Sequence, residues 1–350
     1  MNPAKTRPLN LRTQRSVPCT AMGFGGAPLG NLYRAITEEE AQATLQAAYD
    51  GGIRFFDTAP QYGLGRSEGR FGEAIGRFGR ENIQLSTKIG RLLIDCEPDE
   101  VTPEAFVDVP QKRIVFDYTY DGVMKSYEAS RKRIGIANSD VLLVHDVDVF
   151  SQGSQEKSDA KVRELFDGGG YRALEELRSA GEIAAIGAGV NEWQVCERLL
   201  GLGDFDGFLL AGRYTLLEQE ALDSFLPLCI ERDVGIILGG PYNSGILATG
   251  SVAGAKYNYE DAPADIIARV KKIEAVCAAH DTPLIAAALQ FVMGHPAVKT
   301  VIAGAMSADE VRSNLSVFQT SIPDGLWSDL RGEGLIREDA PLPSEREDAA

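Results

Sequence analysis

Eight short apolar runs recur along the 350-residue chain, and the stretches between them are mostly amphipathic. This repetition constrains the fold more than any other feature, because it is typical of βα units that form a parallel sheet. The predicted strands are Cys19–Met22, Ile53–Phe56, Ile83–Thr87, Val141–Val144, Ala184–Ala188, Gly207–Leu210, Val234–Leu238 and Lys299–Ala303. Eight such strands predict a closed (β/α)8 barrel, an α/β fold of the TIM-barrel type, in a single domain over residues 1–336.

Several helix ends can be predicted from capping residues. Thr37 and Glu40 have the spacing of a capping box at the start of one helix, and Gly51 stands where that helix should end. Ser67 and Asp121 are expected to be the N-caps of two further helices.

Two segments are too long for the simplest barrel, namely Arg91 to Tyr120 after the third strand and Asp146 to Gly170 after the fourth. Both follow the C-terminal ends of strands, where barrel enzymes keep their sites, so we expect them to be long loops that cover a substrate. Disordered surface insertions are the alternative. Residues 337–350 are acidic and rich in proline, and we expect this tail to be unstructured.

Composition narrows the class of partner. The net charge of -16 argues against nucleic acid, whose recognition depends on patches of Lys and Arg. No apolar run is long enough to cross a membrane, and the basic N-terminus lacks the apolar core of a signal peptide, so a cytoplasmic location is expected. Five scattered cysteines without C-x-x-C spacing argue against a disulfide framework and a zinc site. A small molecule is the expected partner, and the oligomeric state is left open.

Four polar side chains stand at or just beyond the ends of predicted strands. Asp57 and Tyr62 follow the second strand, Lys88 ends the third, and His145 ends the fourth. Each residue alone has an ordinary structural explanation, but four of them at successive strand ends are hard to explain by packing. The carboxyl ends of parallel strands meet at one mouth of a barrel, so we expect the four to form one site.

These residue types suit proton transfer. A phenol titrates near pH 10 in water, and a nearby cation such as Lys88 would stabilise its phenolate. Asp57 would keep that ammonium charged inside the barrel, and His145 could hold a substrate oxygen near Tyr62. We interpret the set as acid–base groups with no nucleophile and no metal, which favours hydride transfer to or from a carbonyl carbon with a nicotinamide cofactor.

The stretch GIRFFDTAPQYGLGRSEGRFGEAI, together with STK at the third strand and LLVHD at the fourth, resembles the aldo-keto reductase family. The resemblance extends from about Cys19 to Asn314. It implies a (β/α)8 barrel with an Asp–Tyr–Lys–His tetrad, at Asp57, Tyr62, Lys88 and His145, and a nicotinamide cofactor bound without a Rossmann fold. Consistent with this, GFGGAPLG and IGAGVNE lack the full G-x-G-x-x-G spacing.

The resemblance also implies cofactor contacts. Asn191 matches the residue that holds the carboxamide of the nicotinamide, whereas Ala211 and Gly239 replace a glutamine and a stacking aromatic of the family. The nicotinamide ring must therefore be supported differently, by the backbone at Gly239 and Gly240 or by Tyr214. The remaining expected contacts are Gly25 at the first strand, Asn243, Ser244, Gly245 and Leu247 at the pyrophosphate, and Gly304, Met306, Glu310 and Asn314 at the adenosine.

Glu310 predicts a preference for NAD over NADP, because a carboxylate accepts hydrogen bonds from ribose hydroxyls and repels a 2'-phosphate. The alternative is that Glu310 only stabilises the first turn of a helix, with Arg312 left to reach a phosphate. NADP therefore stays possible.

Within the family, RFFDTAPQYG, GVNEW, GRYTLLEQ and GGPYNSGIL resemble the bacterial aldose 1-dehydrogenases for L-fucose and D-threo-aldoses, with pyridoxal 4-dehydrogenases close by. This implies oxidation of an aldose of the L-fucose, L-galactose or D-arabinose type at C1 to its lactone, with Tyr62 as general acid/base. The runner-up is oxidation of pyridoxal to 4-pyridoxolactone, and a non-catalytic nicotinamide-sensing subunit is the alternative from another class. Trp193 and Tyr120 are candidate platforms for a sugar ring, although core packing explains either as well.

Overall fold

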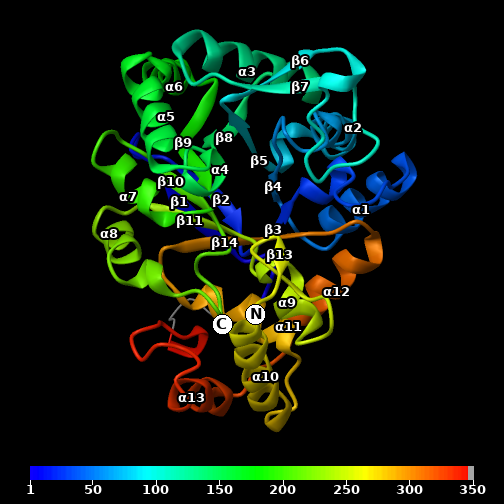
Figure 1. Ribbon diagram of the computed structural model, residues 1–350, viewed down its shortest axis with the longest axis vertical. Coiled ribbons are helices and arrows are strands. Elements are labelled where there is room, and N and C mark those ends of the chain that lie inside the picture. The colour runs from blue at the N-terminus through cyan, green and yellow to red at the C-terminus, as the bar shows by residue number, and fades with distance from the viewer. Residues whose placement is uncertain (346–350) are drawn as a thin grey trace.

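The computed structural model describes residues 1–345, and its centre is a closed barrel of parallel strands surrounded by helices (Figure 1). The barrel strands are β3 (Met22–Gly25), β4 (Phe55–Asp57), β5 (Gln84–Ile89), β8 (Ser139–His145), β9 (Ile183–Val190), β10 (Gly207–Ala211), β11 (Gly235–Gly239) and β14 (Val298–Gly304). They follow one another around the barrel in chain order, and β14 closes it against β3. The predicted (β/α)8 barrel is confirmed.

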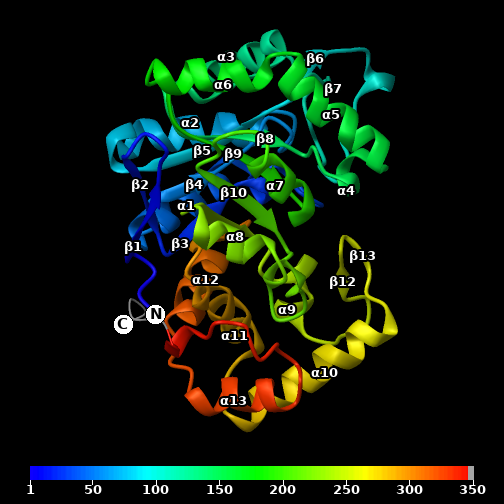
Figure 2. The same cartoon turned by 90° about the vertical axis from the view of Figure 1, so that its left-hand side faces the viewer.

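The first predicted strand is wrong in its position. The range Cys19–Met22 is divided between β2 (Ser16–Thr20), which pairs antiparallel with β1 (Thr6–Asn10), and the barrel strand β3. Side chains of this hairpin, including Leu9 and Val17, join Phe55 and Leu143 in a buried cluster inside the barrel. The hairpin therefore plugs one end of the barrel, and Figure 2 shows it on the opposite side from the hairpin β12 (Lys256–Tyr257) and β13 (Glu260–Asp261).

The capping box that begins the first helix is confirmed. Thr37 Oγ1 accepts from the N–H of Glu40 at 3.1 Å, Glu40 Oε2 accepts from the N–H of Thr37 at 2.7 Å, and Gly51 is the C-cap. The helices around the barrel are α1 (Glu38–Asp50), α2 (Arg66–Phe78), α3 (Tyr120–Ile134), α6 (Gly170–Ser179), α7 (Trp193–Leu200), α8 (Phe225–Glu231), α10 (Ala264–Ala279), α11 (Leu284–Phe291), α12 (Ala308–Phe318) and α13 (Asp324–Gly332). No single helix of residues 1–345 is long and apolar enough for a membrane span, and only a pair bent by 101°, α10 with residues 284–294, reaches that length together.

The other two predicted N-caps are wrong. Helix α2 is preceded by Gly65, so Ser67 lies inside the helix, and its hydroxyl donates to the carbonyl of Gly26 at 2.9 Å. Helix α3 is capped by Thr119, whose side chain accepts from a backbone N–H of the first turn, and Asp121 lies within that turn. In both helices the chain enters the helical conformation earlier than the polar residue that was expected to begin it.

The two long segments are ordered rather than irregular loops. The first forms an antiparallel hairpin, β6 (Arg91–Asp95) and β7 (Lys112–Phe116), and the second forms helices α4 (Val149–Gln152) and α5 (Gln155–Asp167). A further short helix, α9 (Ile246–Thr249), follows β11. Short 3-10 helices are η1 (Ala27–Gly30), η2 (Arg80–Asn82), η3 (Pro98–Glu100), η4 (Glu220–Leu222), η5 (Asn243–Gly245), η6 (Val292–Gly294) and η7 (Pro343–Glu345).

The expectation of an unstructured tail is wrong for its described part. Ala340 and Leu342 are buried, and the guanidinium of Arg331 contacts the carboxylate of Glu345 at 3.1 Å. Arg337 also pairs with Asp223, and its N–H donates to Gln219 at 2.7 Å, so buried apolar side chains and ion pairs hold a segment that its composition alone assigns to solvent. Residues 346–350 lie outside the described residues.

Candidate active site

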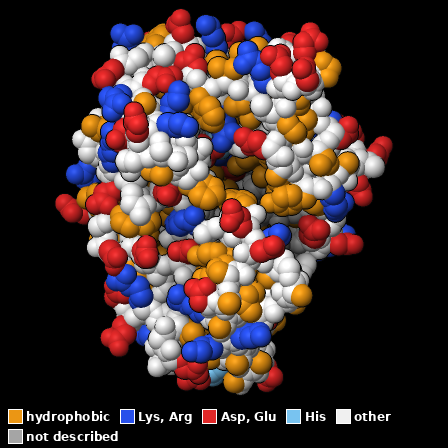
Figure 3. Space-filling model, in the orientation of Figure 1, with side chains coloured by type: hydrophobic (Ala, Val, Ile, Leu, Met, Phe, Trp, Pro, Cys, Tyr) orange, Lys and Arg blue, Asp and Glu red, His pale blue; other side chains and the backbone are white. Residues whose placement is uncertain are grey.

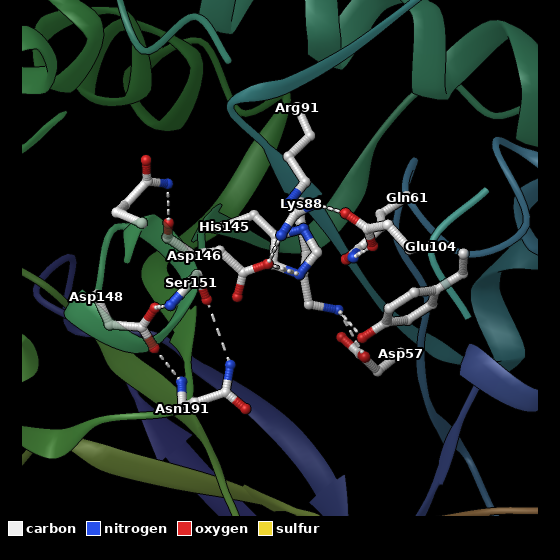
Figure 4. Close-up of polar contacts among 12 residues, drawn as sticks. Asp57, Gln61, Lys88, Arg91, Glu104, His145, Asp146, Asp148, Ser151 and Asn191 are labelled. Atoms are coloured by element: carbon white, nitrogen blue, oxygen red, sulfur yellow. Dashed lines mark hydrogen bonds and ion pairs between the residues drawn. The ribbon is translucent and has the colours of Figure 1, made fainter. Parts of the chain in front are cut away.

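The period of two along a strand places three predicted residues in one layer at the barrel mouth (Figure 4). Along β4, Phe55 belongs to the cluster inside the barrel and Phe56 to the core outside it, so Asp57 points inward again. Leu143 is likewise inside the barrel, which directs His145 inward at the end of β8. The neighbouring strand β5 contributes Lys88 from between these two strands.

Lys88 and Asp57 form a buried ion pair in which every donor of the ammonium is used. Lys88 Nζ donates to Asp57 Oδ2 at 2.7 Å, to the carbonyl of Thr58 at 2.8 Å and to the hydroxyl of Tyr62 at 3.1 Å. Ser86 Oγ donates to the other carboxylate oxygen of Asp57 at 2.7 Å. Both charged side chains are 1% exposed. Burial by itself would lower the pKa of Lys88, but Asp57 and Tyr62 outweigh burial and raise it, so the lysine is held charged.

Tyr62 reaches this pair because the loop that carries it turns at two glycines with positive φ. Gly63 has φ 64° and Gly65 has φ 93°. A Cβ on Gly63 would lie 2.3 Å from the carbonyl oxygen of Gly30, so glycine is required there. Burial raises the pKa of Tyr62 to about 12, and Lys88 opposes that rise. The predicted influence of Lys88 is right in direction, but burial outweighs it.

Gly189 on β9 makes room for the side chain of Lys88. A Cβ at this position would lie 3.2 Å from Lys88 Cε and 3.5 Å from its Cδ. Contacts at this distance require the neighbouring side chain to shift, and the lysine is held by three hydrogen bonds. A side chain here would therefore disturb the hydrogen bond between Lys88 and Tyr62.

His145 is a neutral imidazole beside the tyrosine. Its ring stands edge-on to the ring of Tyr62 with 6.1 Å between centroids, and the residue is 5% exposed. Burial, together with the positive charges of Arg91 and Lys88, holds the pKa of His145 well below its usual value. Its Nε2 lies 3.3 Å from Oδ2 of Asp146, the next residue in the chain. A neutral imidazole can donate one N–H to a substrate oxygen.

A cavity of about 420 Å³ opens above Tyr62, Lys88 and His145. The face of the molecule in Figure 3 is hollowed near its middle, with hydrophobic side chains around the hollow. Both long segments contribute to the cavity wall, as predicted for substrate-covering segments. The lining residues not predicted from the sequence include Ala27, Leu32, Tyr33, Gln61, Arg91, Glu104, Ala105, Phe106, Asp146, Phe150, Ser151, Leu209 and Tyr259.

One signal in the sequence could have found part of this lining. Asp146 directly follows His145 in LLVHD and could have been examined with it. The aromatic lining comes from loops whose positions no periodicity predicts. The two aromatic residues named as sugar platforms are not among the cavity-lining residues: Trp193 packs against the core, and the hydroxyl of Tyr120 donates to Glu176 at 2.6 Å.

Asn191 and Gly25 suit a nicotinamide cofactor. Asn191 lines the cavity, and its amide makes only long contacts, accepting from Tyr259 at 3.3 Å and donating to Ser151 at 3.5 Å. A ligand carboxamide can replace contacts of this length. A Cβ on Gly25 would meet its nearest neighbour at 3.6 Å, an ordinary van der Waals contact, so packing within the protein does not require glycine there. A nicotinamide is thus compatible with the residues present.

Tyr214 is not available to support the nicotinamide ring. The prediction that Tyr214 replaces the stacking aromatic of the family is therefore wrong. It is fully buried, and its ring lies 5.4 Å from that of Phe291 and 5.5 Å from that of His295, in the core outside the barrel. The reason is that the chain turns sharply at Gly212, where φ is 69°, and directs Tyr214 away from the mouth. The other alternative, backbone support at Gly239 and Gly240, stays a prediction.

The predicted pyrophosphate segment makes more internal contacts than expected. The N–H groups of Asn243, Gly245 and Leu247 donate to carbonyls of Gly240 or Tyr242 at 3.0 to 3.1 Å, and the Leu247 side chain is buried. These three donors are therefore already satisfied. Ser244 is exposed, and its hydroxyl accepts from the N–H of Tyr259 at 2.9 Å.

The predicted adenosine residues lie where β14 leads into α12. Gly304 and Glu310 are exposed and Met306 is half-buried. Glu310 Oε2 accepts from the N–H of Met306 at 2.7 Å, so the carboxylate stabilises this turn. Asn314 is buried, and its amide oxygen accepts from the hydroxyl of Tyr242 at 2.9 Å. Asn314 thus joins α12 to the segment after β11.

The sequence matches the Aldo/keto reductase family over residues 21–332. The chain is an aldo-keto reductase. It is 43% identical to pyridoxal 4-dehydrogenase from Microbacterium luteolum over 326 residues, covering 91% of this chain and 94% of the relative. It is 36% identical to D-threo-aldose 1-dehydrogenase from Pseudomonas sp over 338 residues, covering 95% of this chain and 99% of the relative.

A solved aldo-keto reductase from Bacillus halodurans, in its holo form, superposes with a TM-score of 0.74 at 22% identity, covering 99% of both chains. This likeness shows the fold alone. Aldo-keto reductases use a nicotinamide cofactor, and the dehydrogenase relatives support an oxidoreductase. The predicted family and branch are therefore confirmed.

Proposed function

We propose that this aldo-keto reductase oxidises a cyclic hemiacetal carbon to a lactone, with Tyr62 as the general acid/base and NAD as the preferred cofactor. The observation that carries the proposal is the hydrogen bond of 3.1 Å between Lys88 Nζ and the hydroxyl of Tyr62 at the base of the cavity. When bound, the nicotinamide supplies the hydride acceptor. The expected location is the cytoplasm.

The protein's own side chains handle the proton. Tyr62 takes the proton from the anomeric hydroxyl of the substrate, Lys88 stabilises the phenolate, and Asp57 keeps Lys88 charged. His145, neutral at physiological pH, donates an N–H to the substrate oxygen and holds it near Tyr62. Because the pKa of Tyr62 is raised to about 12, the phenolate fraction grows as the pH rises. We therefore expect oxidation to become faster across the alkaline range.

The cavity wall favours pyridoxal, as its cyclic hemiacetal, over an aldose, which reverses the order predicted from the sequence. Tyr33, Phe106, Phe150 and Tyr259 line the cavity, and the rings of Phe150 and Tyr259 lie 5.9 Å apart. Such rings pack against a flat pyridine ring better than they satisfy several sugar hydroxyls. The relative at 43% identity, a pyridoxal 4-dehydrogenase, supports the same choice.

An aldose is the second candidate, because the cavity also has a polar side. Gln61, Arg91, Glu104 and Asp146 contribute donors and acceptors to the wall, and these could bind sugar hydroxyls. The 36% identity to a D-threo-aldose 1-dehydrogenase supports this reading.

A substrate panel separates these candidates. We expect kcat/KM for pyridoxal to exceed that for L-fucose, L-galactose and D-arabinose, with 4-pyridoxolactone as the product. We also expect kcat/KM to be higher with NAD than with NADP.

The aromatic wall of the cavity is tested by Phe150→Ala, which should raise KM for pyridoxal roughly two- to tenfold, since a lost aromatic contact costs about 0.5–1.5 kcal/mol. Phe150→Tyr keeps the ring and should change KM little. A sugar used better than pyridoxal would favour the second candidate. Cofactor binding without turnover of any of these substrates would favour a nicotinamide-sensing subunit.

A further inference from the structure

Asp146 has a backbone conformation that most side chains avoid. Its φ is 55°, in the left-handed region, where a residue other than glycine is strained. Two hydrogen bonds hold it: its N–H donates to the carbonyl of Gly189 at 3.0 Å, and its carbonyl accepts from Gln152 at 2.7 Å. The hydroxyl of Tyr118 fixes the preceding peptide by donating to the carbonyl of His145 at 2.5 Å. The surroundings therefore fix the place of this carboxylate at the cavity wall.

The carboxylate itself joins an arginine to the catalytic histidine. Asp146 Oδ2 lies 2.6 Å from a guanidinium nitrogen of Arg91 and 3.3 Å from Nε2 of His145. Arg91 also contacts Glu104 at 2.8 Å. Arg91 therefore anchors Asp146, and the same oxygen atom faces the imidazole.

This arrangement distinguishes the two nitrogens of the neutral imidazole. Nδ1 is buried and has no hydrogen-bond partner in residues 1–345, so a proton there would be an unsatisfied buried donor. With the proton on Nδ1, the lone pair of Nε2 would also lie close to the carboxylate of Asp146, which is repulsive. With the proton on Nε2, the positive end of the N–H dipole is close to the carboxylate instead, with 3.3 Å between Nε2 and Oδ2, and this is favourable without the geometry of a hydrogen bond.

We propose that Asp146 is a positioning residue that keeps the proton of His145 on Nε2, the nitrogen on the cavity side. The contact of 3.3 Å between Nε2 and Oδ2 does not have the geometry of a hydrogen bond, so the N–H is left to donate to a substrate oxygen. This last step rests on the proposed function, whereas the position of the proton does not.

The proposal has a consequence at low pH. Burial raises the pKa of Asp146 to about 6, and Asp148, the N-cap of α4, adds to the rise, while Arg91 on β6 and Lys88 on β5 oppose it. Above this pH the carboxylate is charged and selects the proton on Nε2. Below it, the protonated Asp146 can donate to Nε2, so its preference for that tautomer is lost. Glu104, paired with Arg91, is the other acidic side chain of the cavity wall.

Nitrogen NMR of the histidine rings tests the proposal directly, because the chain has only three histidines. We expect the proton of His145 on Nε2 at pH 8 in the cofactor-free protein. Both Asp146→Gly, which tolerates positive φ, and Asp146→Asn, which is neutral and can donate to Nε2 like the protonated carboxyl group, should shift His145 toward a mixture of tautomers.

Asp329→Asn is the matched control. His280 Nε2 lies 2.7 Å from Asp329 Oδ2. His280 ends α10 and Asp329 belongs to α13, and neither residue lines the cavity, so this change should affect only the His280 signals. A proton on Nδ1 of His145 in the unmodified protein, or unchanged His145 signals in Asp146→Gly, would overturn the proposal. Thermal unfolding shows whether each variant is folded.

Kinetics on a substrate that is turned over adds a second measurement. Asp146→Gly should lower kcat roughly 10- to 100-fold, which is at most the decrease expected when a general acid–base group is removed. The change in KM should be smaller. Asp146→Asn should lower the rate at pH 8 toward that of the unmodified protein below pH 6, and it should remove the change of rate near pH 6. If no substrate is turned over, the proposed function fails while the NMR measurement still decides the position of the proton.

Discussion

The two halves of the barrel mouth are built differently. At β4, β5 and β8, charged and polar side chains contact one another: Asp57, Lys88 and Tyr62 are joined by hydrogen bonds of 2.7 and 3.1 Å. At β9 to β14, the strands end in small residues such as Ala211 and Gly239, and few side chains reach the cavity. One half holds the groups that we propose to transfer a proton and is called the catalytic half; the other leaves space that we propose for a cofactor and is called the cofactor half.

This difference decides how far each half depends on a ligand. The catalytic half is complete in the protein alone, because every proton of the Lys88 ammonium already has an acceptor. In the cofactor half, the amides of Asn191 and Asn314 bond to tyrosine hydroxyls from other segments, at 3.3 and 2.9 Å. Changes in the first half should therefore alter chemistry and folding, and changes in the second should alter cofactor choice.

Tyr62→Phe should have the largest effect. Removing the hydroxyl deletes the acid/base group but leaves the ring in place, so kcat should fall roughly 10²- to 10⁴-fold. The dissociation constant of the cofactor, measured by fluorescence titration, should change by no more than about twofold, which is well under about 1.4 kcal/mol. A variant with an unchanged rate would break the comparison, because the catalytic half would then not contain the acid/base.

Lys88→Met separates folding from chemistry in the same half. It leaves the Asp57 carboxylate buried without its cation, and we expect the free energy of unfolding to fall by about 3–5 kcal/mol, measured with denaturant. Adding Asp57→Asn removes both charges and should recover most of that stability but none of the activity. A double variant as unstable as the single one would show that the pair is not the reason for the loss.

The sequence predicted which polar side chains meet at the barrel mouth, and their catalytic roles stay a prediction. Asp57, Lys88 and His145 are placed by strand period and register, which a short local pattern specifies. The first barrel strand was missed because β2 and β3 are separated only by Ala21, and the pattern cannot show where one sheet ends. The aromatic wall with Phe150 and Tyr259 depends on how ordered segments pack over the mouth, which periodicity does not encode.

Glu310→Gln should have the smallest effect and tests the cofactor half. The side chain keeps an acceptor for the N–H of Met306, so the turn should persist, but the negative charge is lost. We expect the ratio of kcat/KM for NAD to that for NADP to fall roughly two- to fivefold, the range for an exposed charge interaction. Asp309→Asn is the matched control, because it removes the same charge from the preceding residue, which contacts Arg312 at 2.5 Å. Equal changes in both variants would show that overall charge, rather than a local contact of Glu310 with the ribose, sets the preference. A tenfold preference of the unmodified protein for NADP would contradict the assignment of NAD itself.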